Sequence, residues 1–172
     1  MRGLDWLKRL WRPRRDEATI PLYRAIVTRA RAEHWYVAGA VPDTVDGRFD
    51  AIAAVLSIVL LRLEREPEGA APATALAEHF VDDMDAQLRQ IGFGDMVVGK
   101  QVGRMMAALG GRLGAYRDAF ADGSLEDALI RNLYRDDAPS ASAVEHVATE
   151  LRCLHDDLST RPIATLLSGE LP

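Results

Sequence analysis

The joint Gly92-Phe93-Gly94-Asp95 constrains the fold of this chain most, because two amphipathic helical patterns meet there. Upstream, apolar residues recur at helical spacing at Leu76, Phe80, Met84, Leu88 and Ile91. Downstream, a longer apolar stripe runs from Val98 to Phe120 in steps of three or four residues. Gly92 suits the left-handed end of a helix, and Asp95 suits the cap of the next one. The pattern predicts two core helices joined by a hinge, with Phe93, Asp95 and Met96 facing a partner.

Similar patterns elsewhere predict an all-α, single-domain bundle of about six helices over residues 20–172. The expected helices span about 21–38, 48–66, 73–91, 96–121, 124–136 and the region from 140 onward, with a short turn at 163–167. The helix at 48–66 is apolar nearly all round, which is typical of the centre of a bundle. Asp46-Gly47 is expected to form a turn, Ser124 a capping box with Asp127, and Ser140 a cap. No segment alternates with period two.

Charge is distributed unevenly along the 172 residues. Residues 1–15 hold six basic residues and one acidic residue, a balance of +5. The remainder holds 15 basic and 25 acidic residues, a balance of −10. An acidic body argues against nucleic-acid binding. The single cysteine, Cys153, excludes an internal disulfide framework and fits a reducing compartment.

Residues 1–19 are predicted to form a basic amphipathic arm and linker. Leucines and tryptophans share one helical face and cations line the other, and the expected membrane-binding residues are Trp6, Leu7, Lys8, Arg9, Leu10 and Trp11. This composition favours an interfacial position on an anionic leaflet, and Pro13 ends the helix. Two alternatives are an arm that docks on its own domain and the stub of a transit peptide. Arginine greatly outnumbers lysine, which suggests GC-rich coding and a bacterial source. With the arm on an anionic leaflet, the expected position is cytoplasmic and peripheral on the bacterial inner membrane, or on the mitochondrial matrix face in a eukaryote.

The acidic cluster Asp82-Asp83-Met84-Asp85 is the main candidate for chemistry. It resembles half of the magnesium-binding motif of all-α prenyl-transfer enzymes, so a magnesium-dependent enzyme of isoprenoid or quinone metabolism is one alternative function. The simpler interpretation is a solvated helix face with an ion pair between Asp85 and Arg89. The four histidines are scattered without metal-ligand spacing. We therefore expect no catalytic residue, metal site or cofactor.

The glycines of the second core helix need a separate explanation. The pairs Gly99/Gly103 and Gly110/Gly114, with Gly111 beside them, each lower helix propensity by about 1 kcal/mol per residue relative to alanine. They predict close packing of helix backbones, a kink near residues 110–111, or a groove for a peptide.

Three segments together resemble the ubiquinol–cytochrome c chaperone family. They are HWYVAGAVPDTVDGRFD (34–50), FVDDMDAQLRQIGFGDMVVGK (80–100) and GRLGAYRDAF (111–120), and the resemblance spans about residues 21–158. It implies an all-helical, non-enzymatic assembly factor of the respiratory cytochrome bc complex. Its client would be newly made cytochrome b or an assembly intermediate, and a small helper protein would accompany it. A helical scaffold with an unrelated membrane partner is a further alternative.

The resemblance also identifies individual residues of this chain that match the motifs of the family. The first matching set is Asp43, Asp46, Gly47, Arg48, Phe49 and Asp50, and the second is Asp83, Met84, Asp85, Gly92, Gly94, Asp95, Lys100, Gly111, Arg112 and Tyr116. The expected partner-binding residues are Asp85, Phe93, Asp95, Met96, Lys100, Arg112 and Tyr116. Ser57 departs from the histidine common in the family, and Leu109-Gly110 departs from its aromatic residues. The departure at Ser57 argues against metal or haem ligation by that helix.

Overall fold

The computed structural model describes residues 17–90 and 95–172, in which every regular element is helical. In chain order the elements are η1 (Glu17–Thr19), α2 (Ile20–Ala30), α3 (Glu33–Val37), α4 (Val45–Leu63), η2 (Pro67–Gly69), α5 (Ala70–Gln90), α6 (Asp95–Asp122), α7 (Leu125–Asn132), α8 (Ala141–Ser159) and α9 (Ile163–Leu167). Buried residues from nearly all of these elements form one core. The prediction of an all-α single domain is confirmed. None of the helices in the described ranges has the length and apolarity needed to cross a bilayer.

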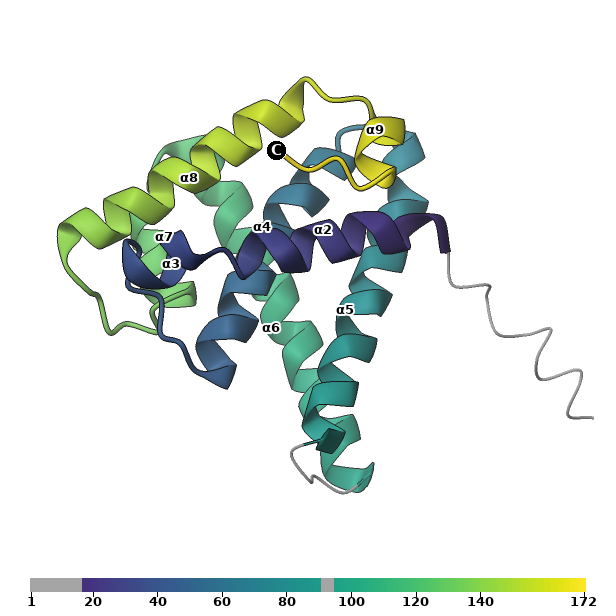
Figure 1. Cartoon of the computed structure of the whole chain (residues 1–172), viewed down its shortest axis with the longest axis horizontal. Coiled ribbons are helices and arrows are strands. Elements are labelled where there is room, and N and C mark those ends of the chain that lie inside the picture. Colours follow the sequence, from purple (N-terminus) through teal and green to yellow (C-terminus); the bar gives the residue numbers. More distant parts are fainter. Residues whose placement is uncertain (1–16, 91–94) are drawn as a thin grey trace, which may run out of the picture.

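Helix α4 lies at the centre of the bundle, as its apolar sequence predicts. Every residue from Phe49 to Leu63 is buried, because α2, α5, α6 and α8 pack around the helix. Figure 1 shows α4 behind α2 and below α8, while α5 and α6 run side by side and extend away from the rest of the body. The two amphipathic helices predicted on either side of residues 92–95 therefore form a projecting pair.

The helix predicted over 21–38 is wrong as a single element, because the chain breaks at Arg31 and Ala32. Ala32 is extended, with φ −60° and ψ 137°. The Trp35 indole donates a hydrogen bond to the Arg29 carbonyl at 2.7 Å, and the Tyr36 hydroxyl donates to the Ala30 carbonyl at 3.0 Å. These two aromatic side chains add hydrogen bonds to carbonyls in the last turn of α2.

The expected turn at Asp46-Gly47 is also wrong, because both residues lie in the first turn of α4. The Thr44 hydroxyl caps this helix by accepting a hydrogen bond from the Gly47 N–H at 3.0 Å. A Cβ atom on Gly47 would lie 1.9 Å from the Pro42 carbonyl oxygen. Glycine is therefore required at position 47 by a close backbone approach.

The helix predicted over 124–136 ends at Asn132, and Arg135 and Asp136 take positive φ angles of 53° and 65°. The Ser124 hydroxyl donates to the Asp127 carboxylate at 2.6 Å and makes no cap bond to the backbone, so the predicted capping box is wrong. The predicted cap at Ser140 is confirmed, since its hydroxyl accepts from the Ala143 N–H at 3.3 Å. The short helix predicted at 163–167 is present as α9.

Four glycines of α6 pack against no other helix in the described part of the chain. Among the described residues, no atom lies within 4 Å of a Cβ built on Gly103, Gly110, Gly111 or Gly114. The prediction that they bring helix backbones together within the bundle is therefore wrong. Gly99 lies outside the residues whose side chains and surroundings are described. Helix α6 continues through residues 110 and 111 without interruption.

A histidine pair joins α3 to α8. The His34 Nδ1 atom lies 3.1 Å from the His146 Nε2 atom, and the His34 ring packs on Trp35. Burial lowers the pKa of His34, and the carboxylate of Glu150 opposes part of that decrease. The other ring nitrogen of His34, Nε2, is buried without a hydrogen-bond partner among the described residues.

We expect Gly103→Ala and Gly110→Ala to raise the free energy of unfolding by about 1 kcal/mol each, because alanine is the better helix former and its methyl group has free space. Gly47→Ala is the opposite control and is expected to destabilise the protein, since its Cβ would collide with Pro42. Urea denaturation of the purified variants measures both effects. Destabilisation by the α6 substitutions would show that these glycines have unseen packing roles.

We expect stability to decline in acid through His34. Because folding lowers this pKa, the unfolded chain binds the proton more tightly than the folded chain. The contribution of neutral His34 to the free energy of unfolding is therefore fully present above about pH 6.5 and is lost as the pH falls below that value. Urea denaturation at several pH values should show a smaller acid loss for His34→Gln than for the original chain. Parallel pH profiles for the two proteins would contradict this.

Candidate partner-binding site

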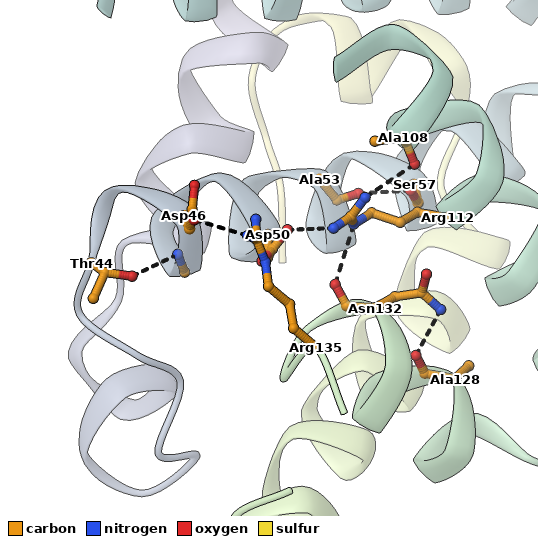
Figure 2. Close-up of polar contacts among 11 residues, drawn as sticks. Thr44, Asp46, Asp50, Ala53, Ser57, Ala108, Arg112, Ala128, Asn132 and Arg135 are labelled. Carbon is orange, nitrogen blue, oxygen red and sulfur yellow. Dashed lines mark hydrogen bonds and ion pairs between the residues drawn. The ribbon is translucent and has the colours of Figure 1, made fainter. Parts of the chain in front are cut away.

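The base of the projecting pair is fixed by a buried ionic network on α4. Asp50 has an exposed fraction of only 1% and accepts hydrogen bonds from two arginines. Its Oδ1 atom lies 2.5 Å from the Arg112 Nη2 atom, and its Oδ2 atom lies 2.6 Å from the Arg135 Nε atom. Arg135 also reaches Asp46 at 2.8 Å, one turn earlier on α4 (Figure 2). The network thus connects α4, α6 and the segment after α7.

Arg112 donates two further hydrogen bonds, both to backbone carbonyls. It donates to the carbonyl of Asn132 at 3.2 Å and to the carbonyl of Ala108 at 3.3 Å (Figure 2). Its guanidinium also lies over the Phe49 ring, 5.4 Å from the centroid. A planar group with five donors is suited to this multiple contact, which a lysine could not reproduce. Arg112 therefore holds α6 against both α4 and the end of α7.

The electrostatics of Asp50 combine two opposing effects. Burial raises the pKa of its carboxyl group, while the hydrogen bonds and positive charges of Arg135 and Arg112 lower it. With two guanidiniums in contact, the carboxylate is compensated rather than isolated in the interior. Removing Asp50 would leave the mostly buried Arg112 without a counter-charge, while Arg135 would keep its ion pair with Asp46.

The structure separates the predicted partner-binding residues into two groups. Arg112 belongs to the buried network, and Tyr116 lies in the core with no exposed surface. The Tyr116 hydroxyl is buried without a partner, and burial raises its pKa above the ordinary value. Asp85 and Lys100 lie instead on the projecting pair, where Lys100 is exposed.

The other predicted residues are not described. Phe93 falls outside the described residues, and the side chains of Asp95 and Met96 do as well. The same holds for the whole set expected to contact the membrane: Trp6, Leu7, Lys8, Arg9, Leu10 and Trp11. Binding of a partner or a membrane by these residues stays a prediction.

Arg135 and Asn132 belong to the network but were not predicted from the sequence. Both residues follow the last apolar position of α7, in a segment where apolar residues do not recur at regular spacing. Arg135 reaches Asp50 from a left-handed backbone conformation. Asp46 and Asp50 were identified only through the family resemblance. Their spacing of four residues puts them on one face of α4, which is the single signal that the sequence offered.

The acidic cluster on α5 is occupied by protein contacts. Asp83 accepts hydrogen bonds from the Tyr23 hydroxyl at 2.9 Å and from Gln87 at 3.1 Å. Asp85 forms the expected ion pair with Arg89 at 2.7 Å. Within the part of the chain that the structure describes, no three histidine, cysteine or acidic residues are arranged to hold a metal ion.

Three glycines of α6 lie along one side of the helix, away from its core stripe. They are Gly103, Gly110 and Gly114, and the nearby Met106 has an exposed fraction of 39%. These glycines lower the helix propensity of α6, and no packing contact among the described residues compensates for that loss. A face made of glycine allows another backbone to approach closely.

Comparison with known proteins finds one family model and one solved structure that resemble this chain. The family model described as Ubiquinol-cytochrome C chaperone matches residues 38–171. The crystal structure of the Cbp3 homolog from Brucella abortus is similar, with 29% sequence identity and a TM-score of 0.78. The alignment covers 96% of this chain and 94% of that one. No curated protein sequence matches the chain.

We expect Asp50→Ala to lower the free energy of unfolding by about 3 kcal/mol, because it leaves two guanidiniums without their shared carboxylate. Asp85→Ala is the matched control and should cost no more than about 0.5 kcal/mol, since it removes a solvated pair within one helix. Denaturant unfolding of both variants tests this. Equal losses would mean that the Asp50 network does not hold the bundle together.

Proposed function

The chain belongs to the ubiquinol–cytochrome C chaperone family, and from this premise we propose that it binds newly made cytochrome b, or an assembly intermediate that contains it. The chain would thereby act as a non-catalytic assembly chaperone of the ubiquinol–cytochrome c reductase complex. The observation that carries the proposal is the family match over residues 38–171, which includes the Asp50 network and the projecting pair. The similarity to the Brucella abortus Cbp3 homolog along almost the whole chain supports it.

The projecting pair α5–α6 is the proposed client-binding surface. It extends from the body (Figure 1), carries exposed Lys100 and partly exposed Asp85, and presents the glycine face of α6. Cytochrome b is a bundle of apolar membrane helices, and the free space beside Gly103 and Gly110 allows the backbone of such a client to approach α6 closely. Arg112 and Tyr116 support this surface from inside rather than touching the client.

The charge distribution suits work at a membrane surface. The cationic arm would contact the anionic leaflet through Trp6, Trp11 and its basic residues. The acidic body would then face cytoplasmic loops of the client, which are enriched in lysine and arginine. We propose a peripheral position on the cytoplasmic face of a bacterial inner membrane, with a small helper protein as a further partner.

Deletion of the gene is expected to deplete the assembled ubiquinol–cytochrome c reductase and its b-type haem absorbance, with recovery when the full chain is supplied. Normal levels of the complex in the deletion strain would contradict the proposal.

In the same strain, Trp6→Ser/Trp11→Ser should shift the protein from membranes to the soluble fraction and reduce recovery.

The client surface is tested by Gly103→Gln/Gly110→Gln, which fills the glycine face with polar side chains while favouring the helix. We expect a stable protein that captures less newly made cytochrome b in a pulldown. Thr149→Gln, on the exposed face of α8, is the matched control and should capture normally. Unchanged capture by the glycine variant would place the client elsewhere.

A further inference from the structure

A second site lies away from the Asp50 network, where α4, α6 and α8 meet. A cavity of about 380 Å³ opens there to solvent, lined by Leu61, Glu64, Arg65, Arg117, Phe120, Ala121 and His155. Leu61, Phe120 and Ala121 give it an apolar wall, and the two arginines give it positive charge. This volume is within the range of small-ligand sites.

The two arginines differ in their partners. Arg117 is neutralised by Glu64, whose carboxylate lies 2.7 Å from its Nη2 atom. Arg65 instead contacts a ring nitrogen, with its Nη2 atom 2.7 Å from the His155 Nε2 atom. Among the described side chains, no carboxylate forms an ion pair with Arg65. Arg65 is therefore the arginine of this cavity whose guanidinium is not paired with a described carboxylate.

The protonation of His155 follows from this contact. Arginine has only donors, so the His155 Nε2 atom must accept, and the ring proton must be on Nδ1. That nitrogen lies 3.2 Å from the Asp156 Oδ1 atom, which can accept the proton's hydrogen bond. The His155 imidazole is thus the hydrogen-bond acceptor for Arg65. The His155 ring stacks on Phe120 with centroids 4.3 Å apart, and this packing fixes the orientation of the ring that Arg65 contacts.

We propose that this cavity binds the carboxylate of a partner polypeptide, either an acidic side chain or a chain terminus. A guanidinium with unused donors binds a carboxylate through two parallel hydrogen bonds. The short aliphatic stem that precedes such a carboxylate would pack on Leu61 and Phe120. The lining residues include none of the α6 glycines, so the site is separate from the glycine face and does not depend on the identity of the client.

The test uses the full chain, labelled for NMR at arginine and histidine side chains, and two acetylated peptides. Ac-Ala-Leu-Glu supplies carboxylates, and Ac-Ala-Leu-Gln-NH₂ is the matched neutral peptide. We expect saturable shifts of the Arg65 and His155 signals with the acidic peptide and at least ten-fold weaker binding of the neutral one. Equal binding of the two peptides, or tighter binding of inorganic phosphate at the same ionic strength, would overturn the assignment.

Variants test whether Arg65 is the residue that binds the acidic peptide. Arg65→Gln should weaken binding of the acidic peptide at least ten-fold, and Arg65→Lys should give an intermediate loss because it keeps the charge without the planar fork. Arg104→Gln, an exposed arginine of α6 that contacts Gln101, should bind normally. If Arg65→Gln binds as well as Arg104→Gln, the proposal is wrong. Neither result tests client capture by the glycine face, because none of those glycines lines this cavity.

Discussion

The burial of α4 on all sides is the constraint on which the rest of the structure depends. A helix surrounded by α2, α5, α6 and α8 can carry a charged group only where neighbouring elements supply a partner. Asp50 obtains its partners from Arg112 and Arg135. Near the other end, Arg62 donates to the carbonyls of Leu158 and Arg161 and pairs with Glu66. These contacts fix how neighbouring elements sit along the central helix.

This arrangement divides α6 into two parts with different roles. Near Arg112 and Tyr116 the helix is held in the core, so its position relative to α4 is set. Toward its N-terminal end it extends with α5 away from the body, and a Cβ on Gly103 in that part would meet free space. A fixed base with a projecting helix pair is consistent with the proposed capture of another polypeptide.

Several features were predicted because they depend on local sequence. The long amphipathic helices on either side of residues 92–95, the buried helix near 48–66, the cap at Ser140 and the Asp85–Arg89 pair all follow from spacings within a few turns. The predictions that failed depended on distant partners. The α2–α3 break is stabilised by Trp35 and Tyr36 folding back on α2, and Gly47 is required by Pro42 rather than by a turn.

The sequence alone determined that the chain is helical, which helix is central, and where charge is concentrated, because periodicity and composition act through local geometry and solvation. Only the tertiary structure decided which charged groups meet. Asp50, Arg112 and Arg135 are far apart in the chain, and the left-handed backbone at Arg135 brings the third to the first. The same is true of Arg65 and His155, and of the α6 glycines, whose free outer face could be known only once the neighbouring helices were placed.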